Sequence, residues 1–327
     1  TGATQNSGEV TLDGVVFNLG ETTVTWTVSD PSNNTIECSY VVVVEDNEAP
    51  EFIIGCSTII GNLSTATNSN IVVNTDSGQN FYTNSGTALD VTATDNSGED
   101  VIITWQLTGA TTGNGETTLN GVVFNLGETT VTWTATDVAG NDVSCSFVVE
   151  VEDNEAPTFI VDCESIGDQT RGTDAGLATY THTNNSWDVV ATDNVGVESL
   201  VCLLSGATPQ FQALTTLEGV TFNLGTTTVK WIATDAAGND VSCTFDVTIE
   251  DTEAPTFVID CEAIGNKEIS TDAGVATYTH TNNSWDVVAT DNVAVTLLTW
   301  ELTGATELEG ATTLNEVEFN LGETLVT

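Results

Sequence analysis

Basic residues are almost absent from this sequence. Its 327 residues include only Arg171, Lys230 and Lys267 against 48 aspartates and glutamates, so the formal net charge is -45. A chain this acidic repels nucleic acid and anionic membrane surfaces, which excludes both as partners. It also repels itself unless cations neutralise it, and we therefore expect divalent ions to be the first partner to consider.

Long apolar runs are missing as well. No stretch of about 20 apolar residues could span a bilayer, and no basic segment followed by an apolar one opens the chain. We therefore expect no membrane insertion in this segment. The apolar content of 39% and the 7 tryptophans still suffice for packed cores, and the length predicts two to four small domains.

Side chains for nucleophilic catalysis are scarce. The only histidines, His182 and His280, lie in two near-duplicate segments, and the third copy of that segment has Tyr82-Thr-Asn84 in their place. A catalytic base would not be expected in two copies of a segment and missing from the third. No glycine-rich phosphate loop opens a helix. The sequence therefore predicts no enzymatic activity.

An internal repeat dominates the sequence. The motif Glu-Asp-Asn/Thr-Glu-Ala-Pro occurs at 45–50, 152–157 and 250–255, spaced 107 and 98 residues apart. A period near 100 residues is typical of an independently folding sandwich and is too long for a solenoid unit. We predict four repeats, called first to fourth below: the C-terminal part of one at 1–46, complete ones at 47–153 and 154–251, and the N-terminal part of one at 252–327.

Apolar and polar residues alternate within each period, which is typical of strands. The alternation is clearest in 229–233 and 243–249, and further strands are predicted at 158–162, 178–181, 187–191, 200–204 and 220–223. No segment shows sustained helical spacing. The fold class is therefore all-β, with tandem immunoglobulin-like β-sandwich domains of about seven strands arranged end to end.

Tryptophan recurs at fixed positions of the repeat. The copies are Trp26, Trp133 and Trp231 at one position, Trp105 and Trp300 at a second, and Trp187 and Trp285 at a third, where the second repeat has Leu89. Strand alternation places the first two sets on the apolar face, so we predict core side chains rather than a sugar-stacking surface. Cys202 takes the position of Trp105, and we predict a buried thiol there rather than a reactive nucleophile.

The other six cysteines form three pairs 18 residues apart: Cys38/Cys56, Cys145/Cys163 and Cys243/Cys261. Bonding within these pairs is disfavoured, because 18 extended residues between two domains in file span up to roughly 60 Å. The first and last strands of one sandwich run parallel and adjacent, so we predict the bridges Cys56–Cys145 and Cys163–Cys243, and we expect Cys38 and Cys261 to pair with partners outside this segment. Such bridges imply an oxidising compartment.

Acidic residues cluster at equivalent loops of every repeat. The linker, the loop between the second and third strands and the loop between the last two strands meet at one pole of a sandwich. Their carboxylates and amides would supply oxygen ligands for Ca²⁺, which takes six to eight. We predict the following ligands: Asp46, Glu48, Asp95, Asp137, Asn141, Asp153, Glu155, Asp193, Asp235, Asn239, Asp251, Glu253 and Asp291. The alternative is that these residues only form turns and caps.

The sequence resembles the hyalin repeat, an immunoglobulin-like module found in tandem in large surface and adhesion proteins, many of them bacterial. The resemblance rests on Glu-Ala-Pro-Thr-Phe-Ile-Val-Asp-Cys163, Ala-Thr-Asp193-Asn194, Asn-Leu-Gly-Thr-Thr-Thr-Val229 and Ala-Thr-Asp235-Ala-Ala-Gly238-Asn239. It covers the whole chain and implies an extracellular or cell-surface location. The usual double proline after the acidic linker is Ala-Pro here, and a second cysteine pair common in the family is missing.

These features together predict a non-catalytic stalk or spacer segment of a large extracellular adhesin or surface fibre, rigidified by calcium at the repeat junctions. Its partners would be the neighbouring repeats of the same chain, and a glycan or surface ligand would bind regions outside this segment. The alternatives are glycan-binding modules and accessory domains of a secreted hydrolase. Dozens of further copies in a full-length chain would favour the stalk, and a single catalytic domain would favour the accessory domains.

Overall fold

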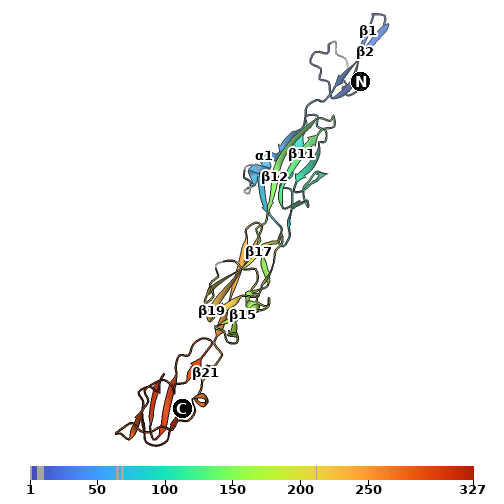
Figure 1. Cartoon of the computed structure of the whole chain (residues 1–327). Coiled ribbons are helices and arrows are strands. Elements are labelled where there is room, and N and C mark those ends of the chain that lie inside the picture. Colours follow the sequence, from blue (N-terminus) through green and yellow to red (C-terminus); the bar gives the residue numbers. More distant parts are fainter. Residues whose placement is uncertain (1, 6–10, 64–65, 68–69, 211) are drawn as a thin grey trace. The chain divides into compact units, whose positions relative to one another are not determined.

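The computed structural model describes residues 2–5, 11–63, 66–67, 70–210 and 212–327. The chain divides into two compact units, one of Thr1–Glu155 with Asp193–Val195 and one of Ala156–Thr192 with Gly196–Thr327. Among the described residues, β-strands dominate and the helices are short (Figure 1). The architecture is all-β, as the alternating pattern predicts.

The main element among the described residues of the first repeat is a long hairpin. Strands β1 (Gly20–Ser29) and β2 (Thr35–Val44) pair antiparallel, with Trp26 opposite Cys38. The turn between them is closed by Asp30, whose backbone N–H and C=O bond to Asn34 and Asn33. The chain then runs through the acidic linker into the second repeat.

The second repeat is a sandwich whose larger sheet has the strand order β4-β5-β12-β11-β8-β9. Two short pairs, β3 with β7 and β6 with β10, form the opposite side. The long strands β11 and β12 lie side by side in Figure 1. The elements are β3 (Glu51–Ile54), α1 (Cys56–Asn62), β4 (Ala66–Thr67), β5 (Asn70–Asn74), β6 (Phe81–Thr83), β7 (Thr92–Thr94), β8 (Ile102–Gly109), β9 (Gly113–Glu116), β10 (Val123–Asn125), β11 (Gly127–Thr136) and β12 (Asp142–Glu152).

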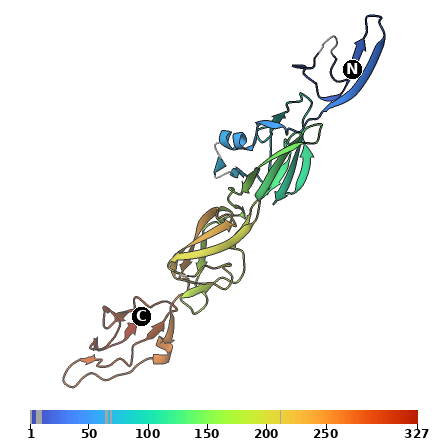
Figure 2. The ribbon, with the colours of Figure 1, turned by 90° about the horizontal axis from the view of Figure 1, so that it is seen from above.

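The third repeat has the same plan, with the sheet order β14-β20-β19-β17 and the pairs β13 with β16 and β15 with β18. Figure 2 shows its long strands running alongside one another from a second direction. The elements are β13 (Thr158–Val161), α2 (Cys163–Ile166), β14 (Gln169–Gly172), β15 (Thr179–Thr181), β16 (Val190–Thr192), β17 (Val197–Gly206), β18 (Thr221–Asn223), β19 (Gly225–Asp235) and β20 (Asp240–Glu250).

The fourth repeat holds the N-terminal strands of the same fold. Its pairs are β21 with β23 and β22 with β26, and its sheet has the order β25-β24-β27. The elements are β21 (Thr256–Ile259), α3 (Cys261–Ile264), β22 (Thr277–Thr279), β23 (Val288–Thr290), β24 (Thr299–Gly304), β25 (Leu308–Ala311), β26 (Glu318–Asn320) and β27 (Thr324–Val326).

The predicted strands lie close to those of the structure, with one shift. Strand β16 begins only at Val190, and Trp187 lies in a turn before it, where the Asp188 N–H donates to the Asn185 C=O. Trp187 is therefore a core side chain that is held by a turn rather than by a strand. Its exposure is 2%, and Leu89 at the same position of the second repeat is 4% exposed.

Both predicted disulfides are present. Cys56 bonds to Cys145 and Cys163 to Cys243, with Cα–Cα distances of 5.9 and 5.7 Å. The parallel pairing that brings them together is made by β5 with β12 and by β14 with β20. The first cysteine of each bridge begins a short helix, α1 or α2, between the repeat's first strand and this parallel strand. The described residues leave Cys38, Cys202 and Cys261 as free thiols.

The tryptophans fill the sandwich cores. Trp133 and Trp231 are fully buried, each between a valine and an alanine of the same strand face. Trp105 and Trp300 are partly buried, and their indole N–H groups donate to the C=O of Thr118 and Thr313. A ring whose polar edge is bonded inside the repeat is a core element rather than a sugar-stacking surface.

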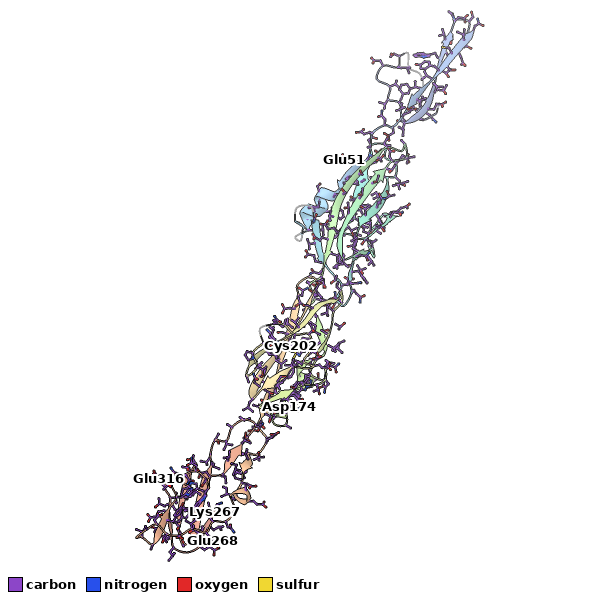
Figure 3. The ribbon with its side chains drawn as sticks, in the orientation of Figure 1. Glu51, Asp174, Cys202, Lys267, Glu268 and Glu316 are labelled. Carbon is purple, nitrogen blue, oxygen red and sulfur yellow. A yellow bond between two sulfur atoms is a disulfide. The ribbon has the colours of Figure 1, made fainter. Side chains whose placement is uncertain are left out.

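The residue at the Trp105 position and the residue paired with it change in size in opposite directions between the second and third repeats. Trp105 pairs with Gly115 across β8 and β9, and a Cβ on Gly115 would lie 2.3 Å from Cζ2 of the indole. In the third repeat the two paired positions hold Cys202 and Leu214. Cys202 is fully buried inside the second unit (Figure 3), and burial raises the pKa of its thiol to about 12. The thiol therefore stays protonated and acts as a small core residue.

The two histidines are also core residues. His182 is 2% exposed and its ring stacks on that of Trp187 at 3.7 Å between centroids, while His280 stacks on Trp285 at 3.9 Å. Neither His182 ring nitrogen has a hydrogen-bond partner among the described residues. Burial lowers the pKa of His182, and Asp188 only partly opposes this. The ring is therefore neutral in the folded protein.

We expect acidification to weaken the third repeat through His182. Because the pKa of His182 is lower in the folded protein than the unfolded value of 6.5, its stabilising contribution is present above pH 6.5 and is lost as the pH falls below that value. The variant His182→Asn copies the second repeat, where the buried Asn84 amide donates to the Leu119 C=O at 3.0 Å.

Thermal unfolding of both proteins between pH 7.5 and 5 tests this effect of pH. The wild-type melting temperature should fall more steeply than that of the variant. Parallel curves would show that His182 does not contribute.

Candidate metal centre

Three aspartates from separate parts of the chain meet in the first unit. Asp46 follows β2 in the linker, Asp95 follows β7, and Asp137 follows β11. One carboxylate oxygen from each lies within 4.8 Å of those of the other two. The linker and the two loops therefore converge as the sequence predicts.

The Asp137 carboxylate also closes its own turn. Its Oδ1 accepts from the N–H groups of Gly140 and Asn141 at 2.7 and 2.8 Å, and its Oδ2 accepts from Asn141 Nδ2 at 2.7 Å. Burial raises the pKa of Asp137, but the hydrogen bonds from Asn141 and Gly140 outweigh it and the pKa is lowered. Asp137 is 4% exposed and is charged at neutral pH.

Asp95 offers an oxygen to the same place. Its Oδ1 accepts from the Ser97 Oγ–H at 2.6 Å and from the Ser97 N–H at 2.9 Å, and these bonds lower its pKa. Its Oδ2 is buried and receives no hydrogen bond from the described residues. A buried anionic oxygen beside two further carboxylates is stabilised only by a cation or a proton.

Asp30 shows what the turn requires in the absence of the cluster. It is the copy of Asp137 in the first repeat, and it makes the same turn, accepting from Asn34 N and Nδ2 at 2.9 and 2.8 Å. Asp30 is exposed, whereas Asp137 is buried beside Asp46 and Asp95. Turn formation alone accounts for Asp30, but it does not explain why the buried Asp137 lies beside two half-buried carboxylates.

Four other predicted ligands of the first unit form hydrogen bonds of their own. Glu48 accepts a hydrogen bond from Asn96 Nδ2, and Asn141 Nδ2 donates to the Asp46 C=O at 3.3 Å. In the first unit, Asp153 Oδ1 accepts from Asn194 Nδ2 at 3.2 Å and Asp193 Oδ2 from the Val195 N–H at 2.9 Å.

The remaining predicted ligands are five residues of the second unit and Glu155 of the first. Asp235 and Asn239 repeat the Asp137 turn, with Oδ2 accepting from Nδ2 at 2.8 Å. Asp251 Oδ1 accepts from the Glu253 N–H at 3.1 Å, and Asp291 Oδ1 accepts from the Val293 N–H at 2.9 Å. The carboxylates of Glu155 and Glu253 both accept from glycine N–H groups, as described below.

Comparison with known proteins shows what these repeats are similar to. Residues 89–151 and 182–249 match the HYR domain model. Hyalin of the sea urchin Strongylocentrotus purpuratus is 31% identical over 271 residues, covering 79% of this chain and 19% of hyalin. Hyalin of Lytechinus variegatus is 29% identical over 287 residues, covering 85% and 47%. The serine-rich adhesin for platelets of Staphylococcus aureus is 27% identical over 202 residues, covering 61% and 8%.

Among solved structures, Drosophila N-cadherin EC1-4 is similar at 14% identity and a TM-score of 0.28, covering 92% of this chain and 74% of that one. The chain spans less than half the length of the hyalins that it matches. These relatives come from sea urchins as well as from a bacterium, so they do not support a resemblance to bacterial surface proteins in particular. The matches do support HYR repeats, carried here on tandem β-sandwiches.

Proposed function

We propose that this chain is a non-catalytic spacer segment of an extracellular adhesion protein. The HYR repeats, the likeness to hyalin and to a platelet adhesin, and two disulfides that need an oxidising compartment support this. No helix among the described residues is long and apolar enough to cross a membrane. Each repeat would position its neighbours, and a surface ligand would bind elsewhere in the longer protein.

Calcium binding at Asp46, Asp95 and Asp137 is the second part of the proposal. The observation that carries it is the buried, unbonded Oδ2 of Asp95 within a group of three carboxylates. Three anionic oxygens within 4.8 Å repel one another strongly in a partly buried place. Hard oxygen donors are the ligands that Ca²⁺ prefers, and the ion would tie the linker to both loops of the sandwich.

A calcium titration of the full chain tests this proposal. At a free Ca²⁺ concentration of 100 times the dissociation constant, binding to the folded state should stabilise it by about 2.7 kcal/mol. Hydrogen exchange in the turn between β11 and β12 should slow on addition of Ca²⁺. The variant Asp95→Asn should lose this response, and its apo form should be as stable as the wild type or more so, because one repelling charge is gone.

The matched control is Asp30→Asn, which changes the same kind of turn where no other acid of the cluster lies. It should keep the full response of the β11–β12 turn. If millimolar Ca²⁺ changes neither the melting temperature nor the exchange of this turn, the aspartates serve only as turn residues.

A further inference from the structure

A second set of contacts recurs in both units and uses none of the three clustered aspartates. In the second unit, the loop that follows β14 meets Asn292, which follows β23 of the next repeat. Asn292 Nδ2 donates to Thr173 Oγ1 at 3.0 Å and to the Leu177 C=O at 2.8 Å. Beside it, the Gly176 N–H donates to both oxygens of the Glu253 carboxylate at 2.9 and 3.2 Å.

The first unit contains the same contacts. Asn194 Nδ2 donates to the Gln79 C=O at 2.7 Å and to Thr75 Oγ1 at 3.4 Å, and the Gly78 N–H donates to Glu155 at 3.0 and 3.2 Å. The partners are 119, 115 and 77 residues apart in both copies. The same atoms therefore meet twice, although the loops 75–79 and 173–177 differ in sequence at two of their five positions.

The receiving loop is built by its own repeat. In Thr173–Leu177, the Asp174 carboxylate accepts from the Thr181 N–H at 2.8 Å, and the Asp174 C=O accepts from the Leu177 N–H at 2.9 Å. Gly176 has a φ of 72°, a conformation that glycine adopts without strain. The N–H that the loop offers to Glu253 is thus held in place before the neighbouring repeat arrives, which reduces the entropy lost on docking.

We propose that the asparagine of the Asp-Asn pair and the linker glutamate form a metal-independent latch, by which a repeat docks on the Thr-Asp-x-Gly loop of the repeat before it. The asparagine of the pair, a neutral donor, binds the preceding repeat. The carboxylate of the glutamate accepts a charge-assisted hydrogen bond and is not left for a cation.

The chain holds an internal reference for this latch. In the second repeat, the matching residues Asn96 and Glu48 bond to each other. Asn96 therefore serves as the reference side chain for Asn292.

Amide hydrogen exchange of the full chain in EDTA, resolved by residue, tests the latch. The Gly176 N–H of the wild type should be protected from exchange, because it donates to the Glu253 carboxylate. Asn292→Ala and Glu253→Ala should each speed Gly176 exchange by on the order of tenfold, while β19 and β20 amides stay protected. Asn96→Ala should leave Gly176 unchanged.

Protection of the wild-type Gly176 N–H that disappears in EDTA would overturn the latch. Protection that persists in both variants would also do so. The calcium proposal is judged separately, because it predicts a response of the β11–β12 turn to Ca²⁺ whether or not Gly176 is protected.

Discussion

Gly115→Leu should destabilise the second repeat by about 1–3 kcal/mol, and Trp105→Cys should destabilise it by about 3–5 kcal/mol. The double variant should recover most of both losses. The first change forces a side chain into the indole, 2.3 Å from where the new Cβ would lie. The second leaves a cavity, which a leucine at position 115 would fill, as Leu214 does beside Cys202 in the third repeat.

Denaturant unfolding, followed by the exchange of β8 and β11 amides, measures this cycle. The reciprocal pair in the third repeat is the control: Cys202→Trp should be tolerated only together with Leu214→Gly. The fourth repeat already has this arrangement, with Gly310 against Trp300. Losses that simply add in the double variant would show that the two positions do not share one volume.

Removal of either disulfide should have the second large effect. The Cys56–Cys145 bridge closes a loop of 89 residues and Cys163–Cys243 one of 80, and each should stabilise its repeat by about 4 kcal/mol by restricting the unfolded chain. Cys56→Ser with Cys145→Ser should therefore lower the melting temperature of the second repeat by more than about 10 °C.

Cys38→Ser and Cys261→Ser are the matched controls, because both thiols are free and exposed. They should leave the melting temperatures unchanged. Peptide mapping without reduction should recover the two bridges described above. A peptide that links Cys145 to Cys163 would contradict this pairing.

The fold could be predicted from the sequence because its main features have local signals. In β20 the buried Phe245, Val247 and Ile249 alternate with half-buried polar residues, as the alternation of apolar and polar residues already indicates. The bridges were predicted from a parallel neighbour of the last strand, and the structure makes that pairing with β5 and β14 rather than with the first strands β3 and β13. The short helix α2 has no such signal, since four residues cannot show a period of 3.6, and only its cap, Asp162 with Ser165, marks it.

The candidate site could be predicted only in part. Convergence of Asp46, Asp95 and Asp137 follows from which loops share a pole of the sandwich. The hydrogen-bond partners of Glu155 and Glu253 could not be predicted in this way, because they depend on which loop of the preceding repeat lies opposite. For the same reason no role could be predicted for Asn194 or Asn292, although the recurring Asp-Asn pair marks their positions.

The placement of the bridges also determines how the chain would respond to a pulling force. Each bond connects the beginning of a repeat, at Cys56 or Cys163, to its last strand. Tension then passes through the sulfurs, and the residues enclosed by the loop carry none of it. From Cys145 to Cys163, 18 residues could lengthen, which is roughly 60 Å when fully extended. A reduced repeat of about 100 residues could extend to roughly 350 Å. Disulfide formation therefore greatly reduces the length that each repeat can gain under tension.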